Sequence, residues 1–96
     1  MQPASEEAER TCRILVIDHD PHILSRVRHI LERDRYEVLT AASGQDGLKL
    51  FQDELPDLVL LDLELPDVGG LDVLAEIKAK RHFAPVMIIA AASEMS

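Results

Sequence analysis

The chain has 96 residues, a length that fits one domain because independently folding domains run to roughly 50–200 residues. Apolar residues make up 47% of the chain and charged residues 29%, a balance typical of a globular protein rather than a disordered one. The 18 acidic and 10 basic residues give a net charge of -8, which disfavours direct binding to nucleic acid or to an anionic membrane surface.

The N-terminal end and the cysteine content favour a cytoplasmic protein. Residues 1–12 are polar and show no period, so we predict a disordered tail before a single domain over residues 13–96. Glu6, Glu7 and Glu9 stand where a signal peptide would carry basic and then apolar residues. Cys12 is the only cysteine and cannot form an internal disulfide. No apolar run approaches the ~20 residues of a membrane span.

Four short apolar runs predict four strands, at residues 14–17, 36–39, 58–61 and 86–89. Three of the runs are continuous and rich in branched residues, which is typical of strands buried on both faces. The run at 36–39 alternates, so we expect its strand nearer an edge of the sheet.

A first helix is predicted to begin at Pro21, with Asp20 as its N-cap. Apolar residues spaced i, i+4, i+7 and i+8 form one stripe along it, namely Ile23, Val27, Ile30 and Leu31.

Two further helices follow in the chain. Ser43 and Asp46 resemble a capping box, and the apolar positions after them are Leu48, Phe51 and Leu55, just before Pro56. The third helix follows Gly69 and Gly70 and has its apolar positions at Leu71, Leu74 and Ile77, before the basic cluster Lys78, Lys80 and Arg81. Strands that alternate with helices predict parallel strands joined by right-handed crossovers, in a doubly wound α/β domain with helices on both faces.

Acidic residues follow two of the predicted strands. Asp18 comes after the first strand and Asp62 after the third. Asp20 is explained as a helix cap, but Asp62 is not, because a loop over residues 63–70 follows it. If the first and third strands are neighbours, Asp18 and Asp62 converge at the carboxyl edge of the sheet, where ligands bind in such folds.

At these positions the chain resembles the receiver domain of two-component response regulators. The resemblance covers about residues 13–92 and rests on Ile14-Leu-Val-Ile-Asp-His-Asp-Pro21, Pro56-Asp-Leu-Val-Leu-Leu-Asp62, Leu65-Pro66, Gly70-Leu71 and Pro85-Val86, in this order. It implies a flavodoxin-like fold with strand order 2-1-3-4, and a domain that is incomplete at its C-terminus, without the fifth strand and helix of the family.

The resemblance also implies a function. Asp62 aligns with the carboxylate that accepts a phosphoryl group from a sensor histidine kinase or a phosphotransfer protein, and the change is passed to a downstream protein partner. Asp18, Asp62 and the backbone carbonyl of Glu64 align with the ligands of Mg²⁺, an ion that prefers oxygen. The domain would be a signalling module and not an enzyme, beyond promoting its own phosphorylation and dephosphorylation.

Two residues depart from the family pattern. His19 stands where the family has a second acid, and imidazole suits Zn²⁺, Cu²⁺ or Ni²⁺ better than Mg²⁺, so we expect weakened Mg²⁺ binding. The simplest interpretation of His19 is a solvated residue at the rim; a ligand for a different metal and a protonated group that supplies positive charge are the alternatives. Ala90 stands at the switch position, where the family has a hydroxyl that contacts the phosphoryl group.

These departures leave alternatives open. The chain could be a degenerate receiver that binds proteins without phosphorylation. A small hydrolase or metal enzyme built on paired acids is disfavoured, because the strand ends offer no nucleophile or base beyond His19. An uncovered fourth strand would be a sheet edge, so we expect self-association or a domain swap, unless the chain is a fragment of a longer protein.

Overall fold

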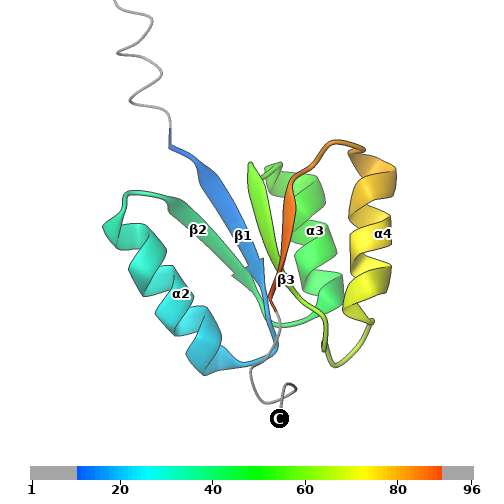
Figure 1. Cartoon of the computed structure of the whole chain (residues 1–96), viewed down its shortest axis with the longest axis horizontal. Helices are drawn as coiled ribbons and strands as arrows, with labels where there is room; N and C mark the ends of the chain where they lie inside the picture. Colours follow the sequence, from blue (N-terminus) through cyan, green and yellow to red (C-terminus); the bar gives the residue numbers. More distant parts are fainter. Residues whose placement is uncertain (1–10, 90–96) are drawn as a thin grey trace, which may run out of the picture.

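The computed structural model describes residues 11–89, which form one four-stranded sheet with helices on both faces (Figure 1). The elements in chain order are β1 (Arg13–Ile17), α2 (Pro21–Arg33), β2 (Glu37–Ala41), α3 (Gly44–Glu54), β3 (Leu58–Asp62), α4 (Gly70–Lys80) and β4 (Val86–Ile89). The strands pair in parallel in the order β2-β1-β3-β4. The predicted doubly wound α/β topology and its strand order are therefore confirmed.

The helices divide between the two faces of the sheet. Helix α2 covers one face, and helices α3 and α4 lie side by side on the other (Figure 1). Because the chain crosses to opposite faces after β1 and after β2, the crossover direction reverses at β1. In such sheets ligands bind beyond the carboxyl ends of the strands at this point, here β1 and β3.

Two apolar cores form, one on each face. Leu15 and Ile17 belong to the larger core under α3 and α4, whereas Ile14 and Val16 belong to the smaller core under α2. Successive side chains of a strand point to opposite faces, so β1 needs an apolar residue at every position. The unbroken apolar run of the first strand follows from this double burial.

Both predicted helix caps are present. Asp20 Oδ1 accepts the backbone N–H of His22 at 2.9 Å, and Pro21 is the first residue of α2. Ser43 Oγ accepts the backbone N–H of Asp46 at 3.2 Å at the start of α3. These contacts satisfy backbone donors that have no partner within their helices.

The predicted apolar stripe of the first helix was wrong in part. Ile23 is 36% exposed and Ile30 is 55% exposed. The residues of α2 that pack on the sheet are Leu24, Val27 and Leu31. Ile23 and Ile30 are seven residues apart and share a flank of α2, about 100° from the side that meets the sheet.

Two further apolar positions were wrongly assigned to the helix cores. Leu55 is 61% exposed because α3 ends at Glu54, and Leu55 adopts a left-handed backbone (φ 49°) before Pro56. Leu71 is 68% exposed, and Val73 and Ile77 are the fully buried positions of α4 instead.

The two edges of the described sheet are β2 and β4. The expected edge position of the second strand is confirmed. On β4, Met87 is 57% exposed and Ile88 is 41% exposed. The expectations for the N-terminal tail up to residue 10 and for Ala90 concern residues outside the described range. None of the helices within residues 11–89 is long and apolar enough to cross a membrane.

Candidate functional site

The two acidic residues predicted to converge do so. Strands β1 and β3 are neighbours, with Ile17 opposite Leu61, so Asp18, which follows β1, and Asp62, the last residue of β3, lie at the same edge of the sheet. Each is only 5% exposed, although it lies at the end of a strand. Two buried carboxylates at one strand edge need compensating donors or cations, because burial disfavours uncompensated charge.

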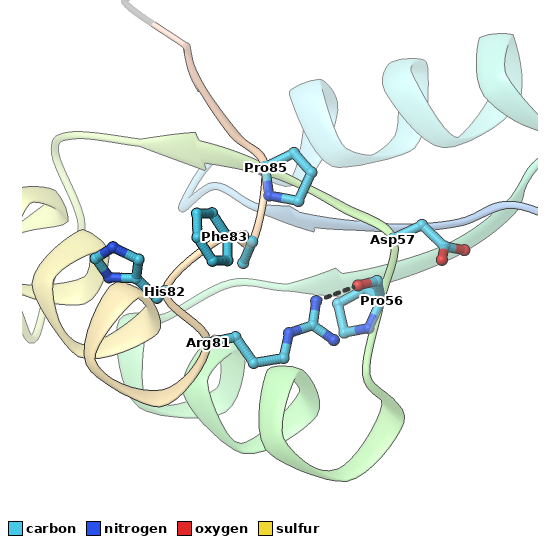
Figure 2. A pocket seen from close by; sticks show the side chains of 7 residues that line it. Pro56, Asp57, Arg81, His82, Phe83 and Pro85 are labelled. Atoms are coloured by element: carbon cyan, nitrogen blue, oxygen red, sulfur yellow. Dashed lines mark hydrogen bonds between the residues drawn. The ribbon is translucent and has the colours of Figure 1, made fainter.

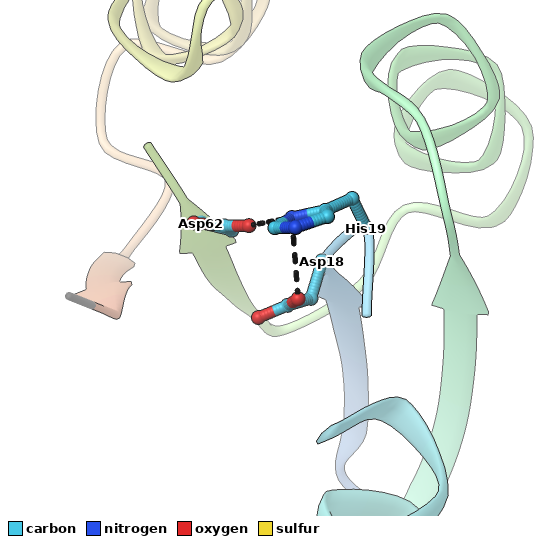
Figure 3. Close-up of side chains that lie close together, drawn as sticks. All are labelled: Asp18, His19 and Asp62. Carbon is cyan, nitrogen blue, oxygen red and sulfur yellow. Dashed lines mark hydrogen bonds and ion pairs between the residues drawn. The ribbon is translucent and has the colours of Figure 1, made fainter. Parts of the chain in front are cut away.

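His19 supplies one of these compensating contacts. Its Nδ1 lies 2.8 Å from Oδ2 of Asp62 and 3.8 Å from Oδ1 of Asp18. An ionised carboxylate only accepts hydrogen bonds, so the imidazole donates here. Figure 3 shows the ring between the two carboxylates. The His19 side chain is 51% exposed, so it lies on the solvent side of the two buried carboxylates.

Backbone N–H groups also hold both carboxylates. Oδ1 of Asp62 accepts the N–H of Glu64 at 3.0 Å, and Oδ1 of Asp18 accepts the N–H of Asp20 at 2.9 Å. In both cases the chain turns back on the carboxylate two residues later, as Asp commonly makes it do. The loops after β1 and β3 are thereby built around the two acids.

The electrostatics of the site shift two pKa values upward. Burial raises the pKa of Asp18, and the negative charge of Asp62 adds to this, while the N–H of Asp20 and the imidazole of His19 oppose it. The hydrogen bond to Asp62 raises the pKa of His19, and nearby negative charges add to this effect against a smaller opposing effect of burial. The site therefore favours a positive group between the carboxylates.

Asp18, His19 and Asp62 form a group that could hold a metal ion. Each residue offers one ligand atom, and these atoms all lie within 4.8 Å of one another. Glu64 lies in the loop after β3 and its side chain is exposed. The role of its backbone carbonyl as a ligand stays a prediction, as does any role of Ala90.

The other histidines that the sequence offers lie away from this group. His22 and His29 are exposed on α2, and His82 is exposed after α4. His82 packs edge-to-face against Phe83, with ring centroids 4.9 Å apart. Their interpretation as surface residues is confirmed.

Sequence reasoning missed the role of Asp67. Its two carboxylate oxygens accept the backbone N–H groups of Gly44 at 2.8 Å and of Gln45 at 2.9 Å, at the start of α3. These bonds lower the pKa of Asp67. Asp67 thus ties the loop that follows Asp62 to helix α3. The partners are 22 and 23 residues apart, so local sequence patterns carried no signal for the contact.

A cavity of about 480 Å³ lies at the opposite end of the sheet, before β3 and β4 (Figure 2). There Arg81 donates to the carbonyl of Pro56 at 2.7 Å, and its guanidinium lies 4.7 Å from the ring centre of Phe51. Arg81 therefore has a structural task, joining the end of α4 to the start of β3. This cavity is separate from the carboxylate group.

Comparison with known proteins agrees with this geometry. A profile of the response regulator receiver domain matches residues 14–96, which is most of the chain. The chain belongs to the response regulator receiver domain family. Receiver domains are signalling domains of two-component systems, and they interact with histidine kinases or phosphotransfer proteins.

Curated relatives of this receiver domain are transcriptional response regulators. It is 40% identical over 83 residues to the transcriptional regulatory protein KdpE of Mycobacterium tuberculosis, covering 86% of this chain and 36% of that protein. It is 34% identical over 82 residues to the alkaline phosphatase synthesis transcriptional regulatory protein PhoP of Bacillus subtilis, covering 85% of this chain and 34% of that protein. The chain thus spans about a third of the length of these relatives.

Solved receiver structures share the fold. A CheY-like receiver domain protein from Methanospirillum hungatei is 33% identical, with a TM-score of 0.83, over 88% of this chain and 70% of that chain. The response regulator TrrA from Thermotoga maritima, solved in complex with Mg(2+)-BeF, is 38% identical, with a TM-score of 0.82, over 88% of this chain and 73% of that chain.

Receiver domains bind Mg²⁺ through acidic residues, but this receiver domain offers a different set of donors. The imidazole nitrogen of His19 lies against Asp62, within a group that otherwise consists of two carboxylates. Mg²⁺ demands near-ideal octahedral coordination by oxygen. The donor set of Asp18, His19 and Asp62 therefore fits Mg²⁺ poorly.

Proposed function

We propose that this receiver domain accepts a phosphoryl group on Asp62 from the phosphohistidine of a sensor histidine kinase or a phosphotransfer protein. The observation that carries the proposal is the placement of Asp62 beside Asp18 at the carboxyl ends of two adjacent parallel strands. Neither Asp62 nor Asp18 caps a helix, whereas Asp20 caps α2.

The reaction needs one free oxygen of Asp62. That oxygen attacks phosphorus, an O–P bond forms, the P–N bond to the donor imidazole breaks, and the electron pair of that bond returns to the imidazole, which takes up a proton. In the structure both oxygens accept hydrogen bonds, Oδ1 from Glu64 and Oδ2 from His19. One of these contacts must open before the transfer.

His19 is the contact that can open. Its side chain is half exposed, and a rotation of the imidazole into solvent frees Oδ2. The backbone N–H of Glu64 keeps its hold on Oδ1, so the carboxylate stays oriented while the other oxygen reacts. In this proposal His19 covers the acceptor in the resting domain and uncovers it for the phosphodonor.

Asp18, Asp62 and the carbonyl of Glu64 are the proposed ligands of Mg²⁺ at this site, and His19 weakens the binding of that ion. A divalent cation would offset the repulsion between the carboxylates and an incoming phosphoryl group. A protonated His19 is the alternative source of positive charge, since its pKa is raised by Asp62.

The proposed partners are proteins. The net charge of -8 disfavours direct contact with nucleic acid, so the modification would be read by a downstream protein partner. Ala90 lacks a hydroxyl, so a phosphoryl group on Asp62 would lose one contact that could change the shape of the domain.

A second function has support from the same contacts. If His19 stays bonded to Asp62, the acceptor remains covered and the domain acts as a protein-binding module without phosphorylation. The alanine at position 90 favours this alternative as well. The two functions differ in whether an oxygen of Asp62 becomes accessible to a phosphodonor.

Intact-protein mass spectrometry after incubation with acetyl phosphate, with Mg²⁺ and in parallel with Zn²⁺, separates the two. We expect the wild-type chain to gain one phosphoryl group and Asp62→Asn to gain none. Asp53→Asn is the matched control, because Asp53 is an exposed carboxylate on α3 that pairs with Lys49 at 3.6 Å, and this variant should gain one phosphoryl group.

Absence of any gain in the wild-type chain would contradict phosphorylation. The same assay on His19→Asp then shows whether the imidazole is the cause, since a gain only in that variant assigns the wild-type chain to the phosphorylation-independent function. A gain in Asp62→Asn equal to that of the wild type would place the acceptor elsewhere.

A further inference from the structure

We propose that Asp18, His19 and Asp62 form a binding site for a divalent transition-metal ion of the Zn²⁺ type, in preference to Mg²⁺. The inference deepens the proposed function, because it assigns the ion that the same site would use. It rests on the position of the His19 imidazole between two buried carboxylates.

The donor types decide the class of ion. Zn²⁺ and related ions accept imidazole nitrogen and carboxylate oxygen together, often with three protein ligands and a fourth position left for water or substrate. Mg²⁺ instead prefers oxygen ligands in octahedral geometry. One imidazole and two carboxylates match the first pattern and leave a position open for a phosphoryl oxygen.

The distances agree with the same class. Ligand atoms that bind one tetrahedral ion at about 2.0–2.1 Å lie about 3.3 Å from one another. Nδ1 of His19 is 2.8 Å from Oδ2 of Asp62 and 3.8 Å from Oδ1 of Asp18, values on either side of that separation. All three ligand atoms lie within 4.8 Å of one another, so the two carboxylates and the imidazole would have to draw together around the ion.

The burial and hydrogen bonds of the three ligands also suit such a site. Asp18 and Asp62 are both 5% exposed and are held by backbone N–H groups, so two of the three ligands are fixed before an ion arrives. His19 is half exposed and can adjust. On binding, an imidazolium would release its Nδ1 proton to solvent, and a neutral ring would carry the proton on Nε2 instead. The freed lone pair of Nδ1 would then coordinate the ion in place of its hydrogen bond to Asp62.

The test is metal titration of the wild-type chain and three variants, by calorimetry with Zn²⁺ and with Mg²⁺ and by visible absorption with Co²⁺. His19→Ala removes the proposed nitrogen ligand and His19→Asp restores an oxygen donor. His22→Ala is the matched control, since His22 is an exposed histidine three residues further on. A Cys12→Ser background removes the exposed thiol as a competing ligand.

We expect His19→Ala to weaken Zn²⁺ binding by at least about tenfold, the scale on which outer-shell partners alone change metal affinity. His22→Ala should leave it unchanged. His19→Asp should weaken Zn²⁺ binding and strengthen Mg²⁺ binding by a similar factor. The absorption bands of tetrahedral Co²⁺ should appear in the wild type and be lost in His19→Ala.

Equal Zn²⁺ affinity of the wild type and His19→Ala would overturn the inference. A loss of Zn²⁺ affinity in His22→Ala and not in His19→Ala would overturn it as well. Wild-type affinity for Mg²⁺ that equals or exceeds its affinity for Zn²⁺ would also overturn it. Phosphorylation assayed on the same samples keeps the two proposals apart. Metal preference without phosphorylation contradicts only the proposed function, and phosphorylation without the preference contradicts only this inference.

Discussion

The hydrogen bond between His19 and Asp62 is the contact on which the chemistry of the site depends at the scale of single residues. It occupies one oxygen of the proposed acceptor and holds an imidazole against two buried carboxylates. In the ordinary family pattern an acid stands at this position, so a single residue changes both the charge and the ligand type of the site.

The raised pKa of His19 gives a prediction about pH. Protonation of the ring favours the folded state, so its contribution to stability is fully present below the unfolded pKa near 6.5 and is lost as pH rises through the raised folded pKa. An NMR titration of the ring in metal-free buffer should give a pKa above 6.5, and Asp62→Asn should lower it towards 6.5. The same value in both proteins would show that Asp62 is not the cause. The ring signal of His19 is identified as the histidine signal that is missing from the spectrum of His19→Ala.

At the scale of elements, the start of α4 supports the loop that follows Asp62. Gly70 is buried, and its N–H donates to the carbonyl of Leu63 at 3.0 Å. A Cβ added at Gly70 would meet the Cα of Leu63 and would lie 2.6 Å from the carbonyl oxygen of Asp62. The φ of Gly70 is not positive. A glycine is therefore needed here for the close approach of two backbone segments, and not for a left-handed conformation.

Gly70→Ala should therefore lower the free energy of unfolding by about 1–3 kcal/mol and displace the loop after β3. The neighbouring glycine provides the control, because a Cβ at Gly69 would have its nearest neighbour, an oxygen of Asp72, at 3.6 Å. Gly69→Ala should change stability by less than about 0.5 kcal/mol. Urea unfolding of both variants measures the difference, and equal stability of the two would contradict the account of this loop.

The elements were largely predictable because each carries a local signal. The caps at Asp20 and Ser43 and the unbroken apolar run of β1 are readable from neighbouring residues. The burial of Ile30 and Leu71 was predicted wrongly. Periodicity shows which residues share one face of a helix, but it does not show which other elements cover that face.

The candidate site was predictable only in part. The convergence of Asp18 and Asp62 followed from the strand order, because residues after adjacent parallel strands meet at one edge. The direction of the His19 ring and the bonds from Asp67 to α3 depend on side-chain conformations and on loops distant in sequence. No local pattern encodes such contacts.

At the scale of the whole molecule, β4 is the least protected part of the described sheet. Met87 pairs with Leu60 of β3 on the face that carries α2, and Ile88 pairs with Leu61 on the opposite face. Both side chains on β4 are more than 40% exposed. An apolar strand edge of this kind is a template for pairing with another chain.

We therefore expect the 96-residue chain to self-associate in a concentration-dependent way, through edge pairing or a domain swap. Met87→Lys places a charge on this edge and should shift the equilibrium towards the monomer. Leu71→Lys is the control, because Leu71 is exposed on α4 and not on the edge strand. Sedimentation velocity at several concentrations measures the effect. A wild-type chain that stays monomeric throughout would contradict the prediction.

The central claim is that Asp62 is the phosphoacceptor, and locating the modified residue tests it most directly. Borohydride reduces an aspartyl phosphate to homoserine and leaves phosphohistidine unreduced, so digestion and mass spectrometry after acetyl phosphate treatment distinguish Asp62 from its neighbours Asp18 and His19. We predict homoserine at position 62 in the wild-type chain and at no position in Asp62→Asn. Homoserine at position 18, or a phosphoryl group that resists reduction on His19, would contradict the claim.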